Sequence, residues 1–484
     1  MTEKTANMAK NSMLNNLNQE RKPAEVSLER KLGLFDSTMI VIGIVIGSGI
    51  FLTTGIMAKS IPSPGLILLA WTVGGILSLA GALTYAELGA AMPEAGGQYI
   101  YLREAYGPAS GFLFGWTMFL VYQTGSIAAL AVAFGEYFGY FFPTLSTTEF
   151  AFSTTIKIFS YSFPYSLSMG QIVAVTVIVL LSFFNFIGLV LGSVIQNIFT
   201  VLKIGALVAI VVLGFILGKG GGAKITFTSG SVNLSTLIMG FGVAMIAVIW
   251  TYDGWNNLNF AAGEIKNPKK NIPYSLVLGV LGVTALYMLV NYMYFYALSI
   301  DEATGVVRIA EKATASLFGG IAPSLISAVV IISTFGALNG VILTGPRVYY
   351  AMAKDRLFFK KVAEVHPRYR TPGFSIFIQA IWACLLTISG SYEQLFTYVT
   401  FATLIFYIFA AASVFTLRKK RPDLPRPYKT WGYPVIPLLF ILAMVGLLVN
   451  TVINKPVESI AGMGLVLIGL PAYYYWRKKS AKGP

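Results

Sequence analysis

Two short segments of unusual composition interrupt long apolar runs of this sequence. Residues 43–51 hold three glycines within seven positions, and residues 250–256 hold Asp253 followed by Gly254. A glycine in a helix interior costs about 1 kcal/mol relative to alanine, and an ionised carboxyl group within a membrane costs about 3 kcal/mol. Both are tolerated where a helix unwinds around a polar cavity. The two segments therefore predict two interrupted helices that line such a cavity.

An unwound helix exposes backbone groups that bind ions. In the first segment, the resuming helix presents the N–H groups of Ser48, Gly49 and Ile50, which attract an anion such as a carboxylate. The half-helix that ends presents carbonyl groups near Ile44 and Val45, which attract an ammonium group. A zwitterionic α-amino acid carries both groups close together, so the pattern predicts an amino acid as the ligand.

The glycines of the first segment also have a packing explanation. Gly43 and Gly47 are four residues apart, which is the spacing of small residues in closely packed membrane helices. Packing alone does not account for the acid and glycine at 253–254. The segment is no dinucleotide-binding fingerprint either, because no strand precedes it.

Lys203 lies about ten residues into another apolar run, at 193–217. At 1.5 Å per residue this is roughly 15 Å from the end of the helix, too deep for the side chain to reach the interface. A buried lysine needs a partner. It can serve as a fixed cation in place of a transported sodium, as a group that binds and releases a proton during transport, or as a brace to helix-end carbonyls.

The composition places the whole chain in a membrane. Its 484 residues are 56% hydrophobic and 11% charged, against about 25% charged in soluble proteins. This excludes an ordinary soluble enzyme, a disordered chain and a nucleic-acid reader, despite the net charge of +15. A single cysteine, Cys384, and a single histidine, His366, leave no disulfide framework and no Cys- or His-based metal site. Because no nucleophile–base pair or phosphate loop stands out, we expect no enzymatic activity, cofactor or metal.

Twelve apolar runs of helical length follow one another along the chain. They lie at about 34–58, 65–86, 111–139, 169–187, 193–217, 234–262, 273–298, 321–346, 373–390, 395–417, 433–453 and 457–476. Residues 87–103 are too polar to span and predict a re-entrant or interfacial loop. The interrupted runs are the first and the sixth, so each opens a set of five. Because five is odd, the second set is inverted relative to the first, which indicates a substrate site at the midplane between inverted repeats.

The predicted fold is an all-α polytopic membrane protein with a 5+5 inverted repeat and two further C-terminal helices. Its parts are a cytoplasmic tail at 1–33, the first repeat at 34–217, the second at 234–417, two helices at 433–476 and a cytoplasmic tail at 477–484. No cleavable signal peptide precedes the first run. With both termini inside, 27 of the 35 Lys and Arg residues fall on the inner side and seven on the outer side. This asymmetry predicts a cell-membrane protein with both termini cytoplasmic.

Several motifs of this chain resemble the amino acid–polyamine–organocation superfamily. Within it they resemble the L-type amino acid transporter family, of the bacterial serine/threonine or alanine-serine-cysteine exchanger type. The resemblance covers about residues 30–478. Its segments are 46–51 (IGSGIF), 252–256 (YDGWN), 264–268 (EIKNP), 335–340 (FGALNG), 366–372 (HPRYRTP), 454–457 (NKPV) and 469–471 (GLP).

The resemblance implies sodium-independent exchange of amino acids by alternating access. Trp250, together with Tyr252, takes the place of an aromatic gate over the substrate, and Lys203 matches the family's lysine in the fifth span. This match favours the fixed-cation explanation for Lys203. The substrate-binding residues carried over, with Thr124 and Ser126 added as candidates for the side-chain pocket, are Val45, Ile46, Gly47, Ser48, Gly49, Ile50, Thr124, Ser126, Trp250 and Asp253.

Three departures bear on partner and substrate. The loop at about 140–168 lacks the cysteine through which many eukaryotic relatives bind a heavy chain, so we expect no disulfide-linked partner and a chain that can act as a monomer. The short tails are typical of prokaryotic members. Trp250 stands where several relatives carry a smaller aromatic residue, which would shrink the side-chain pocket.

Asp253 leaves the substrate class open. Its carboxylate can pair with a basic substrate, or it can cap a half-helix or meet a hydroxyl group while only its backbone touches substrate. We expect an exchanger of small to medium neutral L-amino acids in contact with membrane lipid and with no nucleic-acid partner. The alternatives are a basic amino acid or polyamine exchanger that uses Asp253, a proton symporter in which Lys203 titrates, and a sensor that binds without transport.

Overall fold

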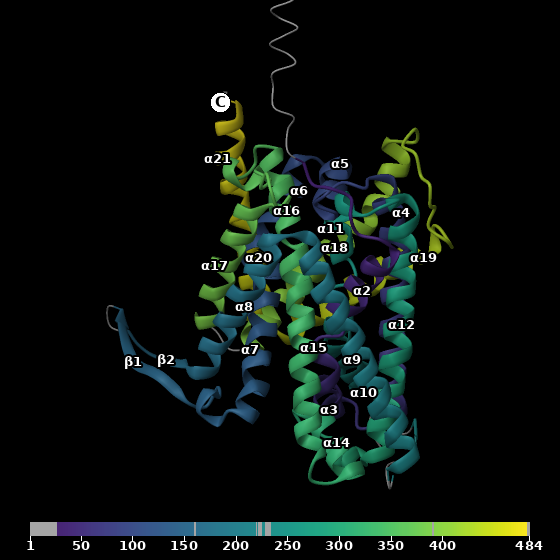
Figure 1. Ribbon diagram of the computed structural model, residues 1–484. Coiled ribbons are helices and arrows are strands. Elements are labelled where there is room, and N and C mark those ends of the chain that lie inside the picture. The colour runs from purple at the N-terminus through teal and green to yellow at the C-terminus, as the bar shows by residue number, and fades with distance from the viewer. Residues whose placement is uncertain are drawn as a thin grey trace, which may run out of the picture.

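The protein is a bundle of helices with a small hairpin at one side (Figure 1). The computed structural model describes residues 27–158, 161–218, 220, 225–227, 234–389 and 392–481. The predicted N-terminal tail therefore lies outside the described residues up to 26, and the C-terminal tail does so from 482 onward.

The helices are α2 (Leu34–Val45), α3 (Gly49–Ser60), α4 (Pro64–Ala91), α5 (Gln98–Tyr106), α6 (Pro108–Thr117), α7 (Gln123–Phe141), α8 (Met169–Ile187), α9 (Leu189–Leu217), α10 (Leu234–Tyr252), α11 (Asn257–Phe260), α12 (Pro268–Ala297), α13 (Ile300–Ala303), α14 (Ile309–Phe318), α15 (Ala322–Thr344), α16 (Pro346–Lys354), α17 (Gly373–Ser389), α18 (Tyr392–Lys420), α19 (Val435–Asn454), α20 (Pro456–Leu467) and α21 (Gly469–Ala481). A π-helix, Met118–Tyr122, joins α6 to α7, and 3-10 turns lie at Pro143–Leu145, Ala262–Glu264 and Lys360–Ala363.

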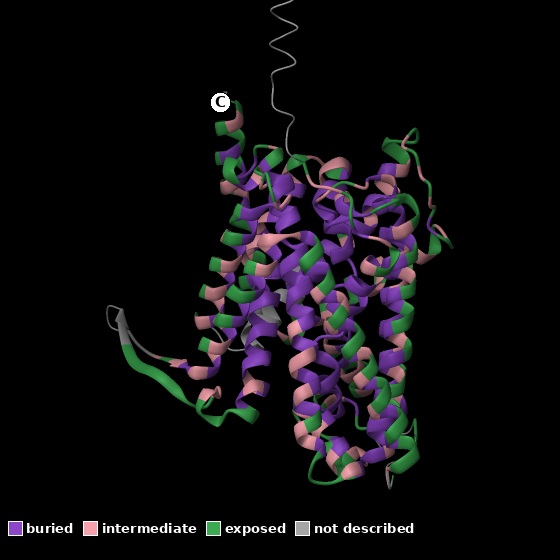
Figure 2. Ribbon diagram, viewed as in Figure 1, coloured by how far each residue is buried: buried purple, intermediate pink, exposed green. Residues whose placement is uncertain are grey.

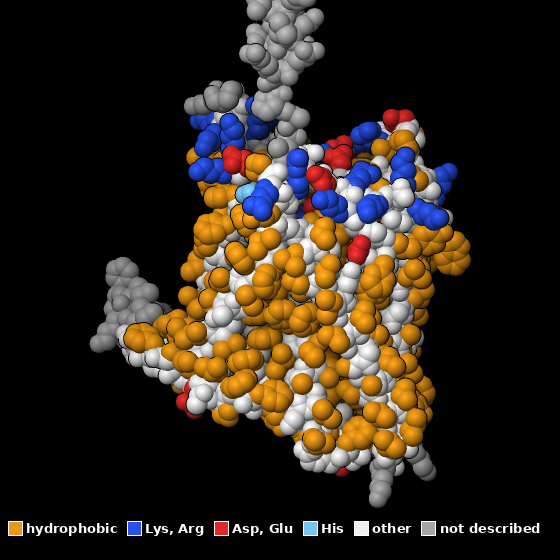
Figure 3. All heavy atoms as spheres, viewed as in Figure 1, with side chains coloured by type: hydrophobic (Ala, Val, Ile, Leu, Met, Phe, Trp, Pro, Cys, Tyr) orange, Lys and Arg blue, Asp and Glu red, His pale blue; other side chains and the backbone are white. Residues whose placement is uncertain are grey.

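Nine helical stretches of the described residues are long and apolar enough to cross a membrane by length and composition. Thr236–Tyr252 and Gly373–Ser389 are shorter apolar helices. The centre of the bundle is buried, whereas many residues on its outer helices are exposed (Figure 2). Those exposed side chains are largely hydrophobic along the middle of the molecule, and Lys and Arg side chains gather at the end that carries the C-terminus (Figure 3). The chain is therefore a polytopic helical membrane protein.

Both predicted interruptions coincide with helix ends. The first apolar run divides into α2, which ends at Val45, and α3, which begins at Gly49. The run that opens the second set divides where α10 ends at Tyr252, and α11 follows from Asn257. Gly254 between them has a φ of 104°, a conformation that side chains other than glycine rarely adopt. α2 packs against α9, α12 and α15, so the first interruption lies inside the bundle.

The all-α prediction is wrong at one place. Strands β1 (Phe150–Ile158) and β2 (Tyr161–Ser168) pair antiparallel, and the hairpin projects from the end of α7 (Figure 1). β1 carries β-branched and aromatic residues in a run too short and polar to span a membrane, which is typical of a strand. The loop expected at about 140–168 therefore contains a hairpin.

The expected loop at 87–103 is also more regular than predicted. α4 continues to Ala91, and α5 begins at Gln98. Glu87 is tolerated inside α4 because the Arg418 guanidinium donates to both carboxylate oxygens, at 2.8 and 2.7 Å, and the Thr430 N–H donates to one at 2.7 Å. A charge paired in this way does not require the helix to end.

Candidate functional site

A small cavity lies where the two helix interruptions meet. Its volume is about 50 Å³, enough for a few water molecules and too little for an amino acid. The bundle is therefore contracted around this point. The cavity is lined by Ile44, Val45, Gly47, Ser48, Gly49, Tyr122, Gln123, Ser126, Leu130, Trp250, Thr251, Asp253, Gly254, Asn257 and Val341.

The glycines of the first interruption pack against different helices. A Cβ on Gly43 would lie 2.1 Å from Gln196 Nε2 and 2.2 Å from Thr200 Oγ1, so Gly43 permits α2 to pack closely against α9. A Cβ on Gly49 would lie 2.6 Å from Thr251 Oγ1, which belongs to α10. Gly47 and Gly49 line the cavity, whereas Gly43 does not. The packing explanation thus holds for Gly43, and close approach of α3 to α10 explains Gly49.

The start of α3 lies at the cavity. Ser48 and Gly49 stand at this end, and both line the cavity. The first N–H groups of a helix have no acceptor inside the helix, and the helix dipole places partial positive charge there. A carboxylate at this point would receive hydrogen bonds without any change of backbone.

The carbonyl end of α2 is held by side chains from three other helices. Lys203 Nζ, which is fully buried, donates to the carbonyls of Gly43 at 2.9 Å and Ile46 at 2.8 Å, and to that of Ser333 at 2.7 Å. The Tyr287 hydroxyl lies 2.8 Å from the Val45 carbonyl oxygen. All three protons of the ammonium group are thereby used on carbonyl oxygens, which ties α2 and α15 to α9.

Ser333 strengthens the same junction. Its hydroxyl lies 3.0 Å from the carbonyl oxygens of both Ile46 and Gly47. The Tyr287 hydroxyl also lies 3.1 Å from the Thr251 carbonyl oxygen, near the end of α10. One tyrosine of α12 thus stands between the carbonyl ends of both interrupted helices.

Asp253 meets two tyrosines at the second interruption. The Tyr122 hydroxyl lies 3.2 Å from each carboxylate oxygen, and the Tyr407 hydroxyl donates to one of them. Asn256 continues the polar chain, because its amide nitrogen donates to Gln98 Oε1 at 2.8 Å. The carboxylate therefore meets hydroxyl groups, and the residue Asp253 also lines the cavity.

Of the residues predicted to bind substrate, several come together around the cavity. They are Val45, Gly47, Ser48, Gly49, Ser126, Trp250 and Asp253. The Ser126 hydroxyl donates to the Tyr122 carbonyl at 2.7 Å.

The other predicted residues lie away from the lining. The Thr124 hydroxyl donates to the Phe119 carbonyl at 2.7 Å. Ile46 and Ile50 are fully buried and contribute carbonyls to the junctions around the first interruption. Tyr252, predicted as part of the gate, is buried and its hydroxyl lies 3.2 Å from the Trp71 carbonyl oxygen.

Tyr122 and Tyr407 are the functional candidates that sequence reasoning missed. Tyr122 is the last residue of the π-helix, and π-helical segments are common at functional sites. No pattern in the sequence predicts this π-helix. Tyr407 comes from α18, far along the chain from Asp253. Its role depends on how α18 packs against α7 and α5, so no local pattern could have identified it.

The described residues contain no group of three or more His, Cys, Asp or Glu side chains placed to hold a metal ion. The cavity offers backbone N–H groups, carbonyls, hydroxyls and one carboxylate instead. These are suited to a small polar organic ligand with both an acidic and a basic group.

Comparison with known proteins agrees with this geometry. A family model described as amino acid permease matches residues 32–468. The serine/threonine exchanger SteT of Bacillus subtilis (strain 168) is 35% identical over 460 residues, covering 94% of this chain and 98% of the relative. The b(0,+)-type amino acid transporter 1 of Homo sapiens is 31% identical over 480 residues, covering 96% and 93%. The large neutral amino acids transporter small subunit 2 of Mus musculus is 30% identical over 463 residues, covering 94% and 83%.

Proposed function

Because the chain belongs to the amino acid permease family, we propose that it is a sodium-independent exchanger of small to medium neutral L-amino acids that works by alternating access. The observation that carries the proposal is the meeting of both helix interruptions at one cavity. The start of α3 supplies donors for the substrate carboxylate, and the ends of α2 and α10 supply acceptors for its ammonium group. Relatives of this chain include transporters and exchangers of amino acids, which supports the reaction class.

Lys203 supports independence from sodium. Its ammonium group binds three carbonyl oxygens that join α2 and α15, as a bound cation would. The fixed-cation and brace explanations of Lys203 coincide in this geometry. A proton-coupled mechanism would require Lys203 to give up at least one of these three hydrogen bonds in each cycle, because a neutral amine has only two protons to donate.

The size of the side-chain pocket supports small substrates. Trp250 lines the cavity, and its indole ring occupies space that a smaller aromatic residue would leave open. The printed name of the Bacillus subtilis relative, a serine/threonine exchanger, agrees with a small substrate. Expansion of the cavity is needed for any amino acid to enter.

A second candidate is exchange of basic amino acids or polyamines. Among the described residues, Asp253 is the one acidic residue that lines the cavity, and this observation favours the second candidate. Against it, the hydroxyls of Tyr122 and Tyr407 already surround the carboxylate. A basic substrate would have to displace at least one of them.

We further propose the membrane arrangement that this function requires. It has twelve spans, with a first repeat at 34–217, an inverted second repeat at 234–417 and two added helices at 433–476. Both termini would be cytoplasmic, which the gathering of Lys and Arg side chains at one end supports (Figure 3). The absence of cysteine from residues 140–168 supports a chain without a disulfide-linked partner.

Counterflow in proteoliposomes tests the function directly. Labelled alanine, serine, leucine or arginine is offered outside, with the same unlabelled amino acid inside or absent, without sodium or a pH gradient. We expect uptake of serine and alanine only with internal substrate. Equal uptake into empty liposomes would overturn exchange, and uptake that follows an imposed pH gradient would identify a proton symporter. Saturable binding without any flux would identify a sensor.

The Asp253→Asn variant separates the two substrate classes. A neutral-amino-acid exchanger should keep its preference for serine over arginine and putrescine in this variant, because the amide still accepts hydrogen bonds from the tyrosines. If wild type prefers arginine and the variant loses that preference selectively, the carboxylate binds a basic substrate.

A further inference from the structure

A larger cavity lies away from the proposed substrate site, between α8 and α17. Its volume is about 730 Å³, and its lining is almost entirely apolar. Several lining side chains remain about half exposed on the outside of the bundle, among them Val179 at 54%, Phe183 at 57% and Phe377 at 57%. In a membrane these surfaces face lipid, so the cavity is a groove open to hydrocarbon. We call it the α8–α17 groove.

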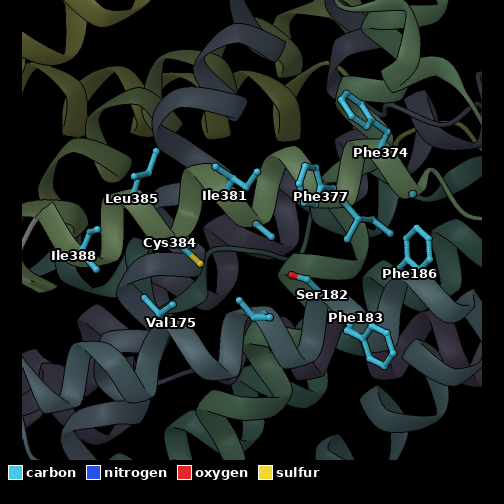
Figure 4. A pocket seen from close by; sticks show the side chains of 14 residues that line it. Val175, Ser182, Phe183, Phe186, Phe374, Phe377, Ile381, Cys384, Leu385 and Ile388 are labelled. Carbon is cyan, nitrogen blue, oxygen red and sulfur yellow. The ribbon is translucent and has the colours of Figure 1, made fainter.

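One polar atom in the α8–α17 groove has no partner. The Ser182 hydroxyl is buried, and no hydrogen-bond partner for it exists among the described residues. Figure 4 shows this oxygen and the sulfur of Cys384 directed into the space between the two helices. Ser182 lies five residues before the end of α8, which is roughly 7 Å along the helix axis. Pure hydrocarbon would leave this donor unsatisfied, whereas an ester carbonyl would accept from it.

A second cavity of about 470 Å³ lies at the end of α8, and we call it the polar cavity because charged side chains join aliphatic ones in its lining. Lys31, Arg368 and Arg370 line it together with one acid, Glu29. We call these four residues the basic rim. Glu29 contacts Lys31 at 2.9 Å and Arg370 at 3.3 Å, and Arg368 has no ion pair among the described residues. The hydrogen bond from Lys31 lowers the pKa of the Glu29 carboxyl, so the basic rim has a net charge of +2 at neutral pH.

The two cavities adjoin at a single aromatic contact. Phe186 lines the α8–α17 groove, and Tyr369 lines the polar cavity. Their ring centroids lie 5.7 Å apart, and the Thr371 hydroxyl donates to the Phe186 carbonyl at 2.8 Å. The phenylalanine rings of the groove gather at this same end, whereas Leu385 and Ile388 lie at the other (Figure 4). A ligand that filled both cavities would have an apolar tail, a polar junction and an anionic head.

We propose that the α8–α17 groove and the basic rim form one binding site for an anionic phospholipid. An acyl chain occupies the groove, an ester carbonyl accepts from Ser182, and the headgroup phosphate contacts Arg368 and Arg370. Lipid tails are as apolar as the groove, so the groove alone does not distinguish one lipid from another. Selectivity comes from the basic rim, because basic pockets at the cytoplasmic ends of membrane helices bind anionic headgroups.

The charges also argue against a second copy of this chain as the occupant. A symmetric contact over this face would place two positively charged rims close to each other. It would also leave Ser182 opposite apolar side chains, without an acceptor. An anionic phospholipid supplies a negative charge for the basic rim and a hydrogen-bond acceptor for the Ser182 hydroxyl.

The single cysteine of the chain makes a test possible without introducing a label site. Cys384 lines the α8–α17 groove, so a lipid in the groove should slow its alkylation by N-ethylmaleimide. The purified full-length chain in detergent would be titrated with phosphatidylglycerol, with phosphatidylcholine of the same acyl chains, and with inorganic phosphate. We expect protection by phosphatidylglycerol at the lowest concentration and none by inorganic phosphate.

Charge variants test the headgroup contact. Arg368→Gln and Arg370→Gln should each raise the half-protecting concentration of phosphatidylglycerol about fivefold, and together about 25-fold. The effect on phosphatidylcholine should be smaller, because its choline group offsets the charge of its phosphate. Glu29→Gln should lower that concentration, because it frees Lys31 and Arg370. The matched control is a double Lys478→Gln and Lys479→Gln variant on α21, which removes the same charge from residues that line neither cavity. Each variant is checked for a single monomeric peak by size exclusion before titration.

Three results would overturn the proposal. Equal protection by both lipids in the wild type would mean that the groove takes lipid without regard to headgroup. Protection by inorganic phosphate alone would mean that the basic rim is a free-anion site. If Cys384 becomes more protected as the protein concentration rises in the absence of lipid, and the protein has a dimeric mass, then a second copy of the chain covers the groove.

Discussion

Gly49 is one point of close approach between the two interrupted helices, and it allows a quantitative prediction. A methyl group at this position would lie 2.6 Å from Thr251 Oγ1 and 2.7 Å from Thr251 Cγ2. Favourable contacts between such atoms require about 3.5–4 Å, so the overlap is about 1 Å. The new methyl would first strike α10, before it reached the space expected for the substrate carboxylate. Gly49→Ala should therefore force α3 away from α10.

Thr251 cannot easily yield to the new methyl group. Its hydroxyl donates to the Ala247 carbonyl at 2.9 Å and lies 2.9 Å from Thr53 Oγ1, which fixes its rotamer. Overpacking of this kind costs about 1–3 kcal/mol. Because substrate binding in the proposed function depends on α3 and α10 keeping this spacing, the apparent affinity should fall by about 5- to 150-fold. The measurement is serine binding to purified protein, together with counterflow per molecule.

A second substitution tests the cause. Thr251→Ala removes the two closest atoms and leaves only the Cβ, 3.0 Å from the position of the new methyl. The double variant Gly49→Ala/Thr251→Ala should therefore recover most of the lost binding, with a coupling energy of about 1–2 kcal/mol. Gly205→Ala in α9 is the control, because a Cβ there meets nothing within 4 Å. Wild-type binding and exchange by Gly49→Ala, or a complete lack of recovery in the double variant, would refute the reasoning.

Three further substitutions probe the bundle around the site. Lys203→Ala removes hydrogen bonds to three buried carbonyls, of which, among the described residues, only that of Ile46 keeps a second side-chain donor, the Ser333 hydroxyl. Because an unsatisfied buried carbonyl costs about 1–3 kcal/mol, counterflow per molecule in the membrane should fall at least about tenfold. Normal exchange would show that Lys203 is not part of the coupling machinery. Trp250→Ala should enlarge the pocket, so inhibition of serine counterflow by leucine, relative to inhibition by alanine, should increase about tenfold. If the relative inhibition by the two amino acids is unchanged, Trp250 does not limit the size of the pocket. Arg347→Met should destabilise the protein by about 3–5 kcal/mol, because it leaves the buried Glu264 carboxylate unpaired. In thermal unfolding in detergent, the double variant Arg347→Met/Glu264→Leu should lose less stability than Arg347→Met alone, because no unpaired carboxylate remains. Equal losses of stability in the two variants would contradict this explanation.

The sequence anticipated the features that depend on local composition. Helix-breaking residues mark the interruptions, because glycine and a lone acid are unfavourable within an apolar helix whatever surrounds them. The depth of Lys203 follows from counting residues along its run. The family follows from motifs that lie along one chain, and the comparisons confirm it.

Other features escaped the sequence because they depend on partners distant in the chain. The continuation of α4 through Glu87 requires Arg418, which is 331 residues later. The hairpin at 150–168 does have a local signal, because aromatic residues alternate with others at Phe150 and Phe152 and again at Tyr161, Phe163 and Tyr165, but the segment was predicted only as a loop. Thr124 looked suitable for the pocket from its place in the run, yet its hydroxyl bonds to a π-helical carbonyl instead.

By itself, the sequence determined that this is a membrane protein of the amino acid permease family with two interrupted helices. These properties follow from hydropathy and from residue types at fixed spacing, which are the same in any tertiary arrangement. Only the tertiary structure decided that both interruptions open on one cavity and that Asp253 is covered by Tyr122 and Tyr407. The carbonyl partners of Lys203 and the groove between α8 and α17 were decided in the same way. Each of these depends on the packing of helices that are far apart in the chain, and the register of such contacts is set by side-chain packing over the whole bundle rather than by any local pattern.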